Sequence, residues 1–248
     1  LSIRLHTLRI TITEPSRNLE QQARDARYLA FSSILPQDST LALAHHQNDV
    51  AETLLLRLMR GSGTNALANM QCHQTRDAYH VWRPLLDCSR LALEAYARHH
   101  QLTWIDDSSN ADQRFDRNFI RHAVLPLLEQ RFPKAPQRLA HSANLLSTDA
   151  GLLAPLIAAC TEQCSEHGQL LVHPLLALEQ GLASQVMRHW LAKHGQSMPG
   201  SAVLTEFLLQ LGKQRPDNDT QLTSADYVLR VWNNRIYICE KNPAEQDA

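Results

Sequence analysis

Glycine is scarce in this chain, with eight residues among 248, and no glycine-rich stretch could cradle a phosphate through its backbone amides. Paired cysteines are missing too. None of Cys72, Cys88, Cys160, Cys164 and Cys239 belongs to a C-x-x-C, and there is no H-E-x-x-H. These absences exclude a Walker-type nucleotide loop, a zinc finger and a zinc protease site. We expect free thiols in a reducing compartment, and no metal held by protein side chains alone.

A strong net charge and a long apolar run are also absent. The formal net charge of −1 argues against nucleic acid, because surfaces that bind phosphate are usually basic. No apolar run approaches the roughly 20 residues of a membrane span, and the first residues mix Arg and His into the apolar pattern, unlike a secretory signal. With 44% hydrophobic and 20% charged residues, the composition is that of a folded globular protein. We expect a cytoplasmic protein without a membrane segment.

The first half of the chain alternates strand and helix patterns. Strands are predicted over residues 1–12, 40–44 and 102–105, with a further extended piece at 81–86 that Pro84 interrupts. Helices are predicted over 19–35, 49–60 and from Ser89 onward, and Trp82 and Trp104 are expected in the core. Strands that alternate with helices indicate an α/β fold, a parallel sheet with crossover helices.

The second half is mainly helical. Helices are predicted over 117–130, 135–166, 174–194 and 200–213. A β-hairpin is predicted over 227–238, because Asn233-Asn234 tolerates the positive φ of a tight turn. We place the domain boundary at Lys134–Pro136, so that residues 1–133 form the α/β part and 134–248 a mainly helical domain with a small hairpin.

The segment AHHQNDVAETLLLRLMRGSG, residues 44–63, gathers residues that can do chemistry. His45 and His46 follow the end of a predicted strand, where ligands of open α/β sheets bind. Asp49 and Glu52 stand three residues apart at a helix start and share a face. Such a group could hold an amine, a metal ion or a proton in transit. An ordinary alternative is that Asp49 favours the helix dipole and Glu52 pairs with an arginine.

This segment resembles the motif of the tRNA(Ile)-lysidine synthetases, members of the N-type ATP pyrophosphatase (PP-loop) superfamily. Four more motifs follow the family's pattern: QQARDARY (21–28), WRPLL (82–86), WIDDSSN (104–110) and FDRNFIRHAVLPLL (115–128). Five motifs together are specific. The resemblance implies the C-terminal part of an adenine nucleotide α-hydrolase-like catalytic domain, followed by a helical tRNA-binding domain.

The family joins the ε-amino group of L-lysine to C2 of the wobble cytidine in a tRNA(Ile) with a CAU anticodon. ATP, with Mg²⁺, first adenylates the C2 oxygen, and lysine then displaces AMP. The resemblance implies that Asp49 and Glu52 bind lysine, and that His45 contacts the nucleotide or transfers a proton. A catalytic carboxylate pair suits the incoming ammonium, whose pKa is about 10.4 in free lysine.

The remaining site residues follow from the same resemblance. Arg117, Asn118 and Arg121 are expected to meet the phosphate or the flipped wobble base. An alternative pairs the two arginines with Asp106, Asp107 or Asp116. Arg24, Arg27 and His46 are predicted near ATP, although Arg24 and Arg27 would also suit a solvated helix face. A homodimer is kept open.

Two features depart from the family pattern. The SGGxDS loop that defines the superfamily is absent, and Val50 stands where the family pattern has Gln. We expect the loop upstream of Leu1, so that this chain is a fragment which alone would be inactive, and we expect another tRNA-binding domain beyond the hairpin. Two alternatives stay open: a catalytically inactive tRNA-binding remnant, and a tRNA thiolase, which the lack of a C-x-x-C disfavours.

Overall fold

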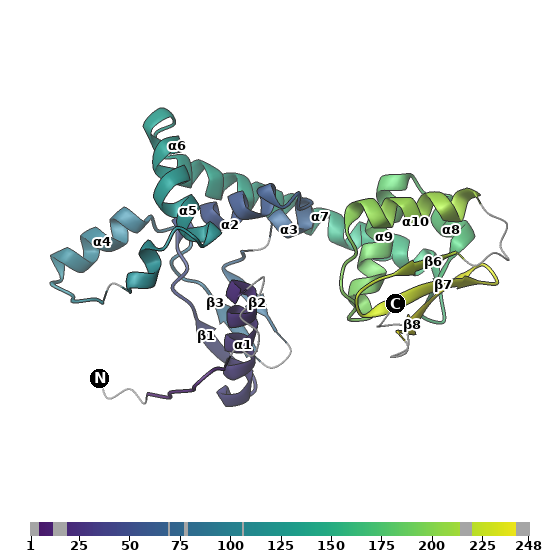
Figure 1. Cartoon of the computed structure of the whole chain (residues 1–248), viewed down its shortest axis with the longest axis horizontal. Helices are drawn as coiled ribbons and strands as arrows, with labels where there is room; N and C mark the ends of the chain where they lie inside the picture. Colours follow the sequence, from purple (N-terminus) through teal and green to yellow (C-terminus); the bar gives the residue numbers. More distant parts are fainter. Residues whose placement is uncertain are drawn as a thin grey trace. The chain divides into compact units, whose positions relative to one another are not determined.

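The N-terminal sheet has three short strands with one helix packed against them. The order is β1 (Ser39–Ala42), β3 (Tyr79–Trp82), β2 (His73–Thr75), with β1 and β3 parallel and β2 antiparallel to β3. Helix α1 (Leu19–Ile34) lies beside this sheet (Figure 1). It buries Tyr28 against Tyr79 and Val81. The computed structural model describes residues 5–11, 19–68, 70–76, 79–105, 107–213 and 220–241.

Helix α2 (Gln47–Met59) packs on two sides against other helices of this region. One side of α2 buries Val50 and Leu54 against Ala140 and Ala143 of helix α7 (Ala135–Gln163). Ala51, on another side, is fully buried with Ile120 and Leu125. Packing on two sides fixes the rotation of α2, and therefore the direction in which its polar first turn points.

The segments that follow in this region are short helices. They are α3 (Thr64–Leu67), α4 (Arg90–His99), η1 (Ser108–Ala111), α5 (Asp116–Phe119), the π-helical η2 (Ile120–Val124) and α6 (Leu125–Arg131). Ser89 caps α4 as predicted, since its side chain accepts a hydrogen bond from the backbone N–H of Ala92.

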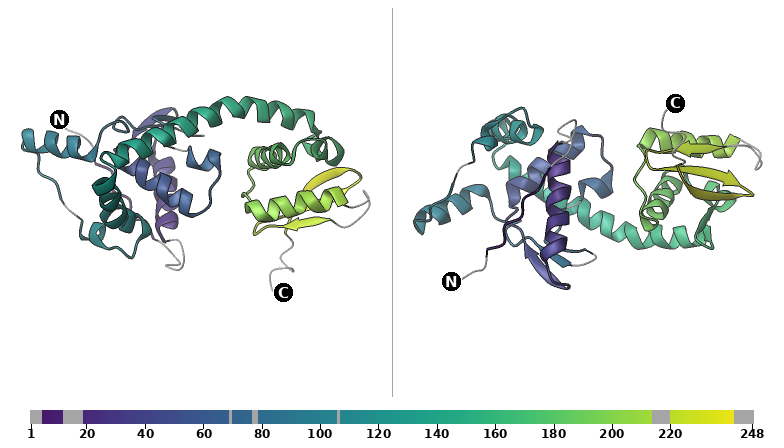
Figure 2. Two further views of the ribbon diagram at one scale, coloured as in Figure 1. Left: turned by 90° about the horizontal axis from the view of Figure 1, so that it is seen from above. Right: turned by 60° about the horizontal axis from the view of Figure 1, so that its bottom comes forward.

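The C-terminal region is an antiparallel sheet with helices over one face. The strand order is β4 (Ser165–Glu166), β5 (Gln169–Leu171), β8 (Arg235–Glu240), β7 (Tyr227–Trp232), β6 (Gln221–Thr223). Helices α8 (Val172–Leu176), α9 (Gln180–Lys193) and α10 (Ser201–Lys213) lie against this sheet (Figure 2). The core between them includes fully buried Leu191, Leu204 and Leu229. The turn at Asn233 and Asn234 has φ values of 47° and 59°, as the predicted hairpin requires.

The chain divides into two compact units, Leu1–Thr148 and Asp149–Ala248. The division falls within α7, whereas the sequence placed a boundary at the start of that helix. Helix α7 is also, among the described helices, the one that is long and apolar enough to cross a membrane by length and composition. The sequence analysis had found no such run. A single helix of this kind is weak evidence for a span, and its first half supplies Ala140 and Ala143 to the core of the first unit.

The α/β class and the later helical region with its hairpin are confirmed, but several details differ. Residues 102–105 form no strand. Ile105 is 95% exposed, so the apolar residues of this segment are not part of a hydrophobic core. Trp82 and Trp104 are exposed, which makes the prediction of two core aromatics wrong. Residues 5–11 form no strand, and the rest of the predicted first strand lies outside the described residues. The hairpin is part of a five-stranded sheet.

Candidate functional site

The first turn of α2 begins where the loop after β1 ends. Asp49 accepts a hydrogen bond at Oδ2 from the backbone N–H of His46, 2.9 Å away, and so satisfies one of the unpaired amides at the helix start. The ordinary alternative of the sequence analysis, an acid that favours the helix N-terminus, is therefore part of what Asp49 does. Its second oxygen, Oδ1, faces another partner.

That partner is a pair of arginines from the segment α5–η2. Arg117 Nη2 lies 2.9 Å from Asp49 Oδ1, and Arg117 Nε lies 2.8 Å from Glu52 Oε2. Arg121 donates from Nε to Glu52 Oε1 at 2.7 Å, and from Nη2 to Glu52 Oε2 at 2.9 Å. We call Asp49, Glu52, Arg117 and Arg121 the carboxylate–arginine cluster.

The cluster is buried on its acidic side and open on its basic side. Glu52 is 1% exposed, while the side chains of Arg117 and Arg121 are 25% and 21% exposed. Two carboxylates face two guanidiniums, so the formal charges cancel. The bidentate geometry is the strong form of such a contact.

This arrangement confirms the ordinary alternative of the sequence analysis for Glu52, which pairs with an arginine. The assignment of the acids to an ammonium, and of the arginines to a phosphate or a base, stays a prediction. The structure pairs Arg117 and Arg121 with Asp49 and Glu52. Asp106 lies outside the described residues. The reason is electrostatic: a carboxylate as buried as Glu52 needs a cation close by.

His45 lies beside this cluster with its ring partly buried. Its Nδ1 is 3.3 Å from Nε of Arg83, the residue that follows β3. Burial lowers the pKa of His45 from 6.5 to about 4; the Asp49 carboxylate opposes this, and the charges of Arg83, Arg117 and Arg24 add to it. A histidine of this kind is neutral at physiological pH.

The other predicted site residues are distributed unevenly. Arg24 is close enough to affect the pKa of His45 and its guanidinium lies 5.7 Å from the ring of Tyr28, whereas Arg27, one turn away, is exposed. His46 caps α2, and its Nδ1 lies 3.5 Å from Asp49 Oδ2 without making a hydrogen bond. Asn118 is buried and donates to the Asp112 carbonyl, which ties down the loop before α5.

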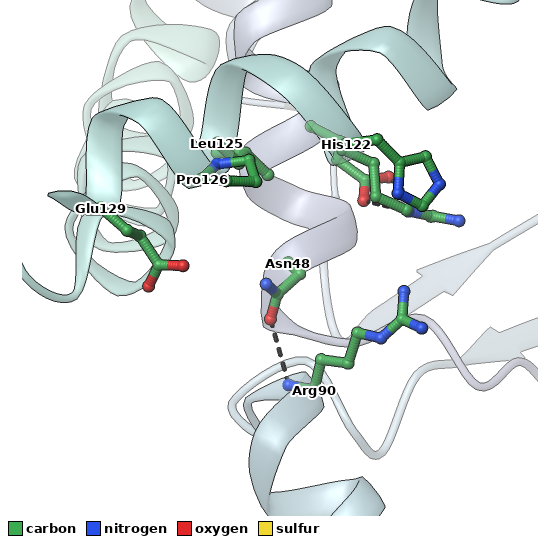
Figure 3. Close-up of a pocket in the computed structure, with 8 residues that line it drawn as sticks. Asn48, Arg90, His122, Leu125, Pro126 and Glu129 are labelled. Atoms are coloured by element: carbon green, nitrogen blue, oxygen red, sulfur yellow. Dashed lines mark hydrogen bonds and ion pairs between the residues drawn. The ribbon is translucent and has the colours of Figure 1, made fainter. Parts of the chain in front are cut away.

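A cavity of about 240 Å³ opens next to the cluster, lined by Asn48, Glu52, Arg90, Arg121, His122, Leu125, Pro126 and Glu129. Glu129 of α6 and Arg90 of α4 border it from different elements, and Asn48 accepts the backbone N–H of Arg90 (Figure 3). Glu52 borders this space and Asp49 does not. The cavity therefore offers both acidic and basic groups to a small zwitterion.

Sequence reasoning missed Arg83, Arg90 and Glu129. Arg83 could have been noticed in the sequence, because it is a cation within the apolar WRPLL segment. A solvated side chain is not expected at such a position. Arg90 and Glu129 carried no such signal, because each stands on an amphipathic helix where a charge is ordinary. No group of three or more His, Cys, Asp or Glu side chains in the described residues is placed to hold a metal.

Comparison with known proteins decides which family this geometry belongs to. The PP-loop domain family matches residues 1–128, and the TilS substrate binding domain matches residues 170–237. The tRNA(Ile)-lysidine synthase of Serratia proteamaculans is 39% identical over 230 residues, 92% of this chain and 53% of the relative. Those of Photorhabdus laumondii and Yersinia pseudotuberculosis are 36% and 38% identical over 237 residues, 95% of this chain and 54% and 52% of theirs.

The chain belongs to the PP-loop domain family, and the relatives that it resembles are tRNA(Ile)-lysidine synthases. It spans about half the length of the curated relatives that it matches. The carboxylate–arginine cluster, His45 and Arg83 all fall within the matched PP-loop domain. The Asn233-Asn234 turn, with β6 and β7, falls within the matched substrate binding domain. The resemblance inferred from five short motifs is thereby confirmed.

Proposed function

We propose that the protein ligates L-lysine to C2 of the wobble cytidine in a tRNA(Ile) with a CAU anticodon, by way of an adenylated tRNA. The observation that carries this proposal is the carboxylate–arginine cluster beside the end of a parallel strand, in a chain of this family. The reaction is a carbon–nitrogen ligation, and we place it in the cytoplasm, where tRNA, ATP and free lysine occur together.

The chemistry requires the C2 oxygen to become a good leaving group. Adenylation by ATP converts that oxygen to a phosphate ester and releases pyrophosphate. The amine of lysine then attacks C2 and AMP leaves. Free lysine arrives as an ammonium, with a pKa of about 10.4, so the site has to hold a cation and let it lose a proton.

Asp49 and Glu52 can bind the lysine ammonium if one of the two arginines of the cluster moves away from them. A buried carboxylate stays close to a positive charge because leaving it unpaired costs several kcal/mol, on the order of 3–5. A lysine ammonium supplies the same charge as a guanidinium. We propose that Arg117 or Arg121, both partly exposed, moves from the acids to the phosphate of the adenylate as lysine enters.

The nucleotide is proposed to bind on the side of His45 and Arg24, whose donors suit phosphate oxygens. The acids of the cluster are neutralised by arginines and do not fit as ligands of Mg²⁺, so the magnesium ion is expected to arrive with the ATP phosphates. Arg27 and His46 stay candidates for the ATP side, and Asn118 for the base. The homodimer stays a prediction from the sequence.

The tRNA is proposed to contact the open face of the C-terminal sheet. Along β7 and β8, Arg230 pairs with Tyr237 across the strands and Trp232 with Arg235, so these side chains share the face opposite to fully buried Leu229 and Ile236. Trp232 is 70% exposed, and its ring lies 6.5 Å from that of Tyr237. Exposed aromatic rings beside arginines suit unstacked RNA bases.

The experiment separates the two half-reactions in the protein as the cell makes it. Asp49→Asn and Glu52→Gln are compared for tRNA-dependent pyrophosphate release and for incorporation of labelled lysine. Asn at position 49 can still accept the His46 amide, so α2 keeps its cap. We expect adenylation to persist and lysine incorporation to fall by at least about 10²-fold, the usual effect of removing one essential polar group.

Glu94→Gln is the matched control, because Glu94 also pairs with an arginine, Arg90, but on the surface of α4. It should leave both half-reactions unchanged. Equal loss of both half-reactions in the Asp49 and Glu52 variants would move the acids to the ATP side. Absence of adenylation in the unsubstituted protein would favour the inactive tRNA-binding remnant.

A further inference from the structure

Arg83 is a buried cation without an acidic partner among the described residues. It is 3% exposed, and its guanidinium donates to three neutral acceptors: the Gln71 carbonyl at 2.9 Å, Gln74 Oε1 at 3.3 Å and His45 Nδ1 at 3.3 Å. Burial of a charge normally demands a counter-charge. The position of Arg83 is therefore costly and calls for a reason.

The contact with His45 fixes the chemistry of the imidazole. A guanidinium has only donors, so Nδ1 of His45 has to be the acceptor and cannot carry a proton. The neutral ring must then hold its proton on Nε2. The tautomer follows from the identity of the partner.

The charges around His45 point in the same direction. Asp49 is the acid that faces it, and Asp49 is already engaged by Arg117 and by the start of α2. The cations that face it are Arg83 after β3, Arg117 of α5 and Arg24 of α1. An imidazolium among three guanidiniums is unfavourable, and a base has to become an imidazolium when it takes a proton.

We propose that Arg83 is a positioning residue that holds His45 as the neutral Nε2–H tautomer, so that His45 donates a hydrogen bond to an anionic oxygen of the bound nucleotide and does not act as the base that deprotonates lysine. The identity of the acceptor as a nucleotide rests on the proposed function. The tautomer of His45 does not depend on the proposed function. The sequence left two roles open for His45, nucleotide contact and proton transfer, and this proposal selects nucleotide contact.

A merely structural Arg83 would pin the 71–74 segment to the loop after β1 and leave the tautomer of His45 undetermined. The two accounts predict different protonation states for the ring nitrogens of His45. Nitrogen-15 spectra of the histidine side chains distinguish a protonated from an unprotonated ring nitrogen, and the His45 signals are assigned by their loss in His45→Gln.

The first measurement uses the unsubstituted 248-residue chain, labelled at histidine, from pH 4 to 8. We expect a proton on Nε2 and a bare Nδ1 at pH 7, with protonation only as the pH approaches about 4. A proton on Nδ1, or a ring that becomes charged near 6.5, overturns the proposal. No substitution is needed, so misfolding of a variant cannot obscure this result.

The second measurement compares Arg83→Met with Arg83→Lys. Lysine keeps a charged donor for Nδ1 and should keep the Nε2–H tautomer, whereas methionine should give mixed tautomers and a pKa that rises from about 4 toward 6.5. Arg76→Met is the matched control, since Arg76 stacks 4.2 Å from the ring of Tyr28. It should leave the His45 signals unchanged. If Arg83→Met leaves the tautomer and the pKa unchanged, Arg83 is structural only.

The third measurement follows lysine transfer to pre-adenylated tRNA in the protein as the cell makes it. His45→Gln retains an N–H donor near the position of Nε2, and His45→Ala does not. We expect about a 10²-fold loss for His45→Ala and a loss at least tenfold smaller for His45→Gln. Equal loss in both variants would make His45 the base. If no lysidine forms at all, the proposed function fails while the tautomer result stands.

Discussion

The two units of the chain bury different kinds of side chain. In the second unit, a continuous core of apolar residues includes Leu191, Leu204, Phe207 and Leu229, and the buried polar groups described there are two threonines. The first unit has three small apolar clusters, yet it buries Asp49, Glu52, Arg83 and Asn118. Burial of charge costs free energy where burial of leucine gains it.

The difference shows which unit is organised for chemistry. The second unit buries no charged side chain among its described residues. In the first unit, the buried acids Asp49 and Glu52 are paired with arginines of the α5–η2 segment, whereas the buried Arg83 is held by neutral acceptors. The turn that carries Arg121 is a π-helix, a form that is often found at functional positions.

The largest expected effect comes from breaking the buried charges. Glu52→Ala leaves two guanidiniums facing one carboxylate and should destabilise the protein by about 3 kcal/mol, the low end for a buried pair, because both arginines are partly exposed. Lysine incorporation should be lost as well. Chemical denaturation and the lysine assay measure the two effects.

Glu94→Ala serves as the surface counterpart and should change stability by less than about 1 kcal/mol. Similar destabilisation in the two variants would mean that the cluster is energetically no different from a surface ion pair. The contrast between the units would then rest on burial alone.

The next effect tests whether the units unfold separately. Leu229→Ala removes a fully buried side chain from the second core and should cost about 2–5 kcal/mol. Hydrogen exchange resolved by segment should speed up in β7, β8 and α10 and stay unchanged in α2. Leu153→Ala, at a half-exposed position of α7, should have little effect. Faster exchange of α2 in Leu229→Ala would show that the two regions form one cooperative unit.

A smaller effect concerns the face of the C-terminal sheet. Trp232→Ala should weaken tRNA binding by about 1–3 kcal/mol, the value of one stacked base, without changing stability. Trp232→Phe keeps an aromatic ring and should recover most of the affinity. Binding measured by filter retention or anisotropy at one fixed salt concentration decides this. Unchanged affinity in Trp232→Ala would place the tRNA on another surface.

The smallest effect is a dependence of stability on pH that belongs to the first unit. The folded state lowers the pKa of His45 from 6.5 to about 4, mainly by burial, so between these values the unfolded chain binds more protons. Stability should therefore be fully present above 6.5 and fall as the pH is lowered from 6.5 to 4. His45→Gln should flatten this part of a denaturation profile. An unaltered slope would assign the titration to other groups.

The sequence predicted best what local patterns determine. The bounds of α1 and α2, the Ser89 cap and the Asn233-Asn234 turn follow from apolar spacing and from residues with a strong local preference. Residues 102–105 show the limit of local patterns, because an apolar run forms a buried strand only if another element covers it. The prediction that Trp104 lies in the core fails in the same way, because its side chain is exposed.

The sequence named the two acids and the two arginines of the cluster as candidate site residues, but it did not predict which acid pairs with which arginine. His45, Asp49 and Glu52 lie within one segment, and periodicity places the two acids on one face. Their arginine partners are 65 and 69 residues away, at Arg117 and Arg121, and no local pattern states which acids they meet. The role of Arg83 was out of reach for the same reason, since it follows from contacts across two strands.

One carboxyl group serves two purposes in this molecule. Asp49 accepts the backbone N–H of His46 with one oxygen and the guanidinium of Arg117 with the other. Apart from asparagine, whose amide oxygen can still accept the His46 amide, a substitution that altered the contact with Arg117 would also alter the first turn of α2. Selection acting on either property therefore constrains the other, so few substitutions at this position can be neutral.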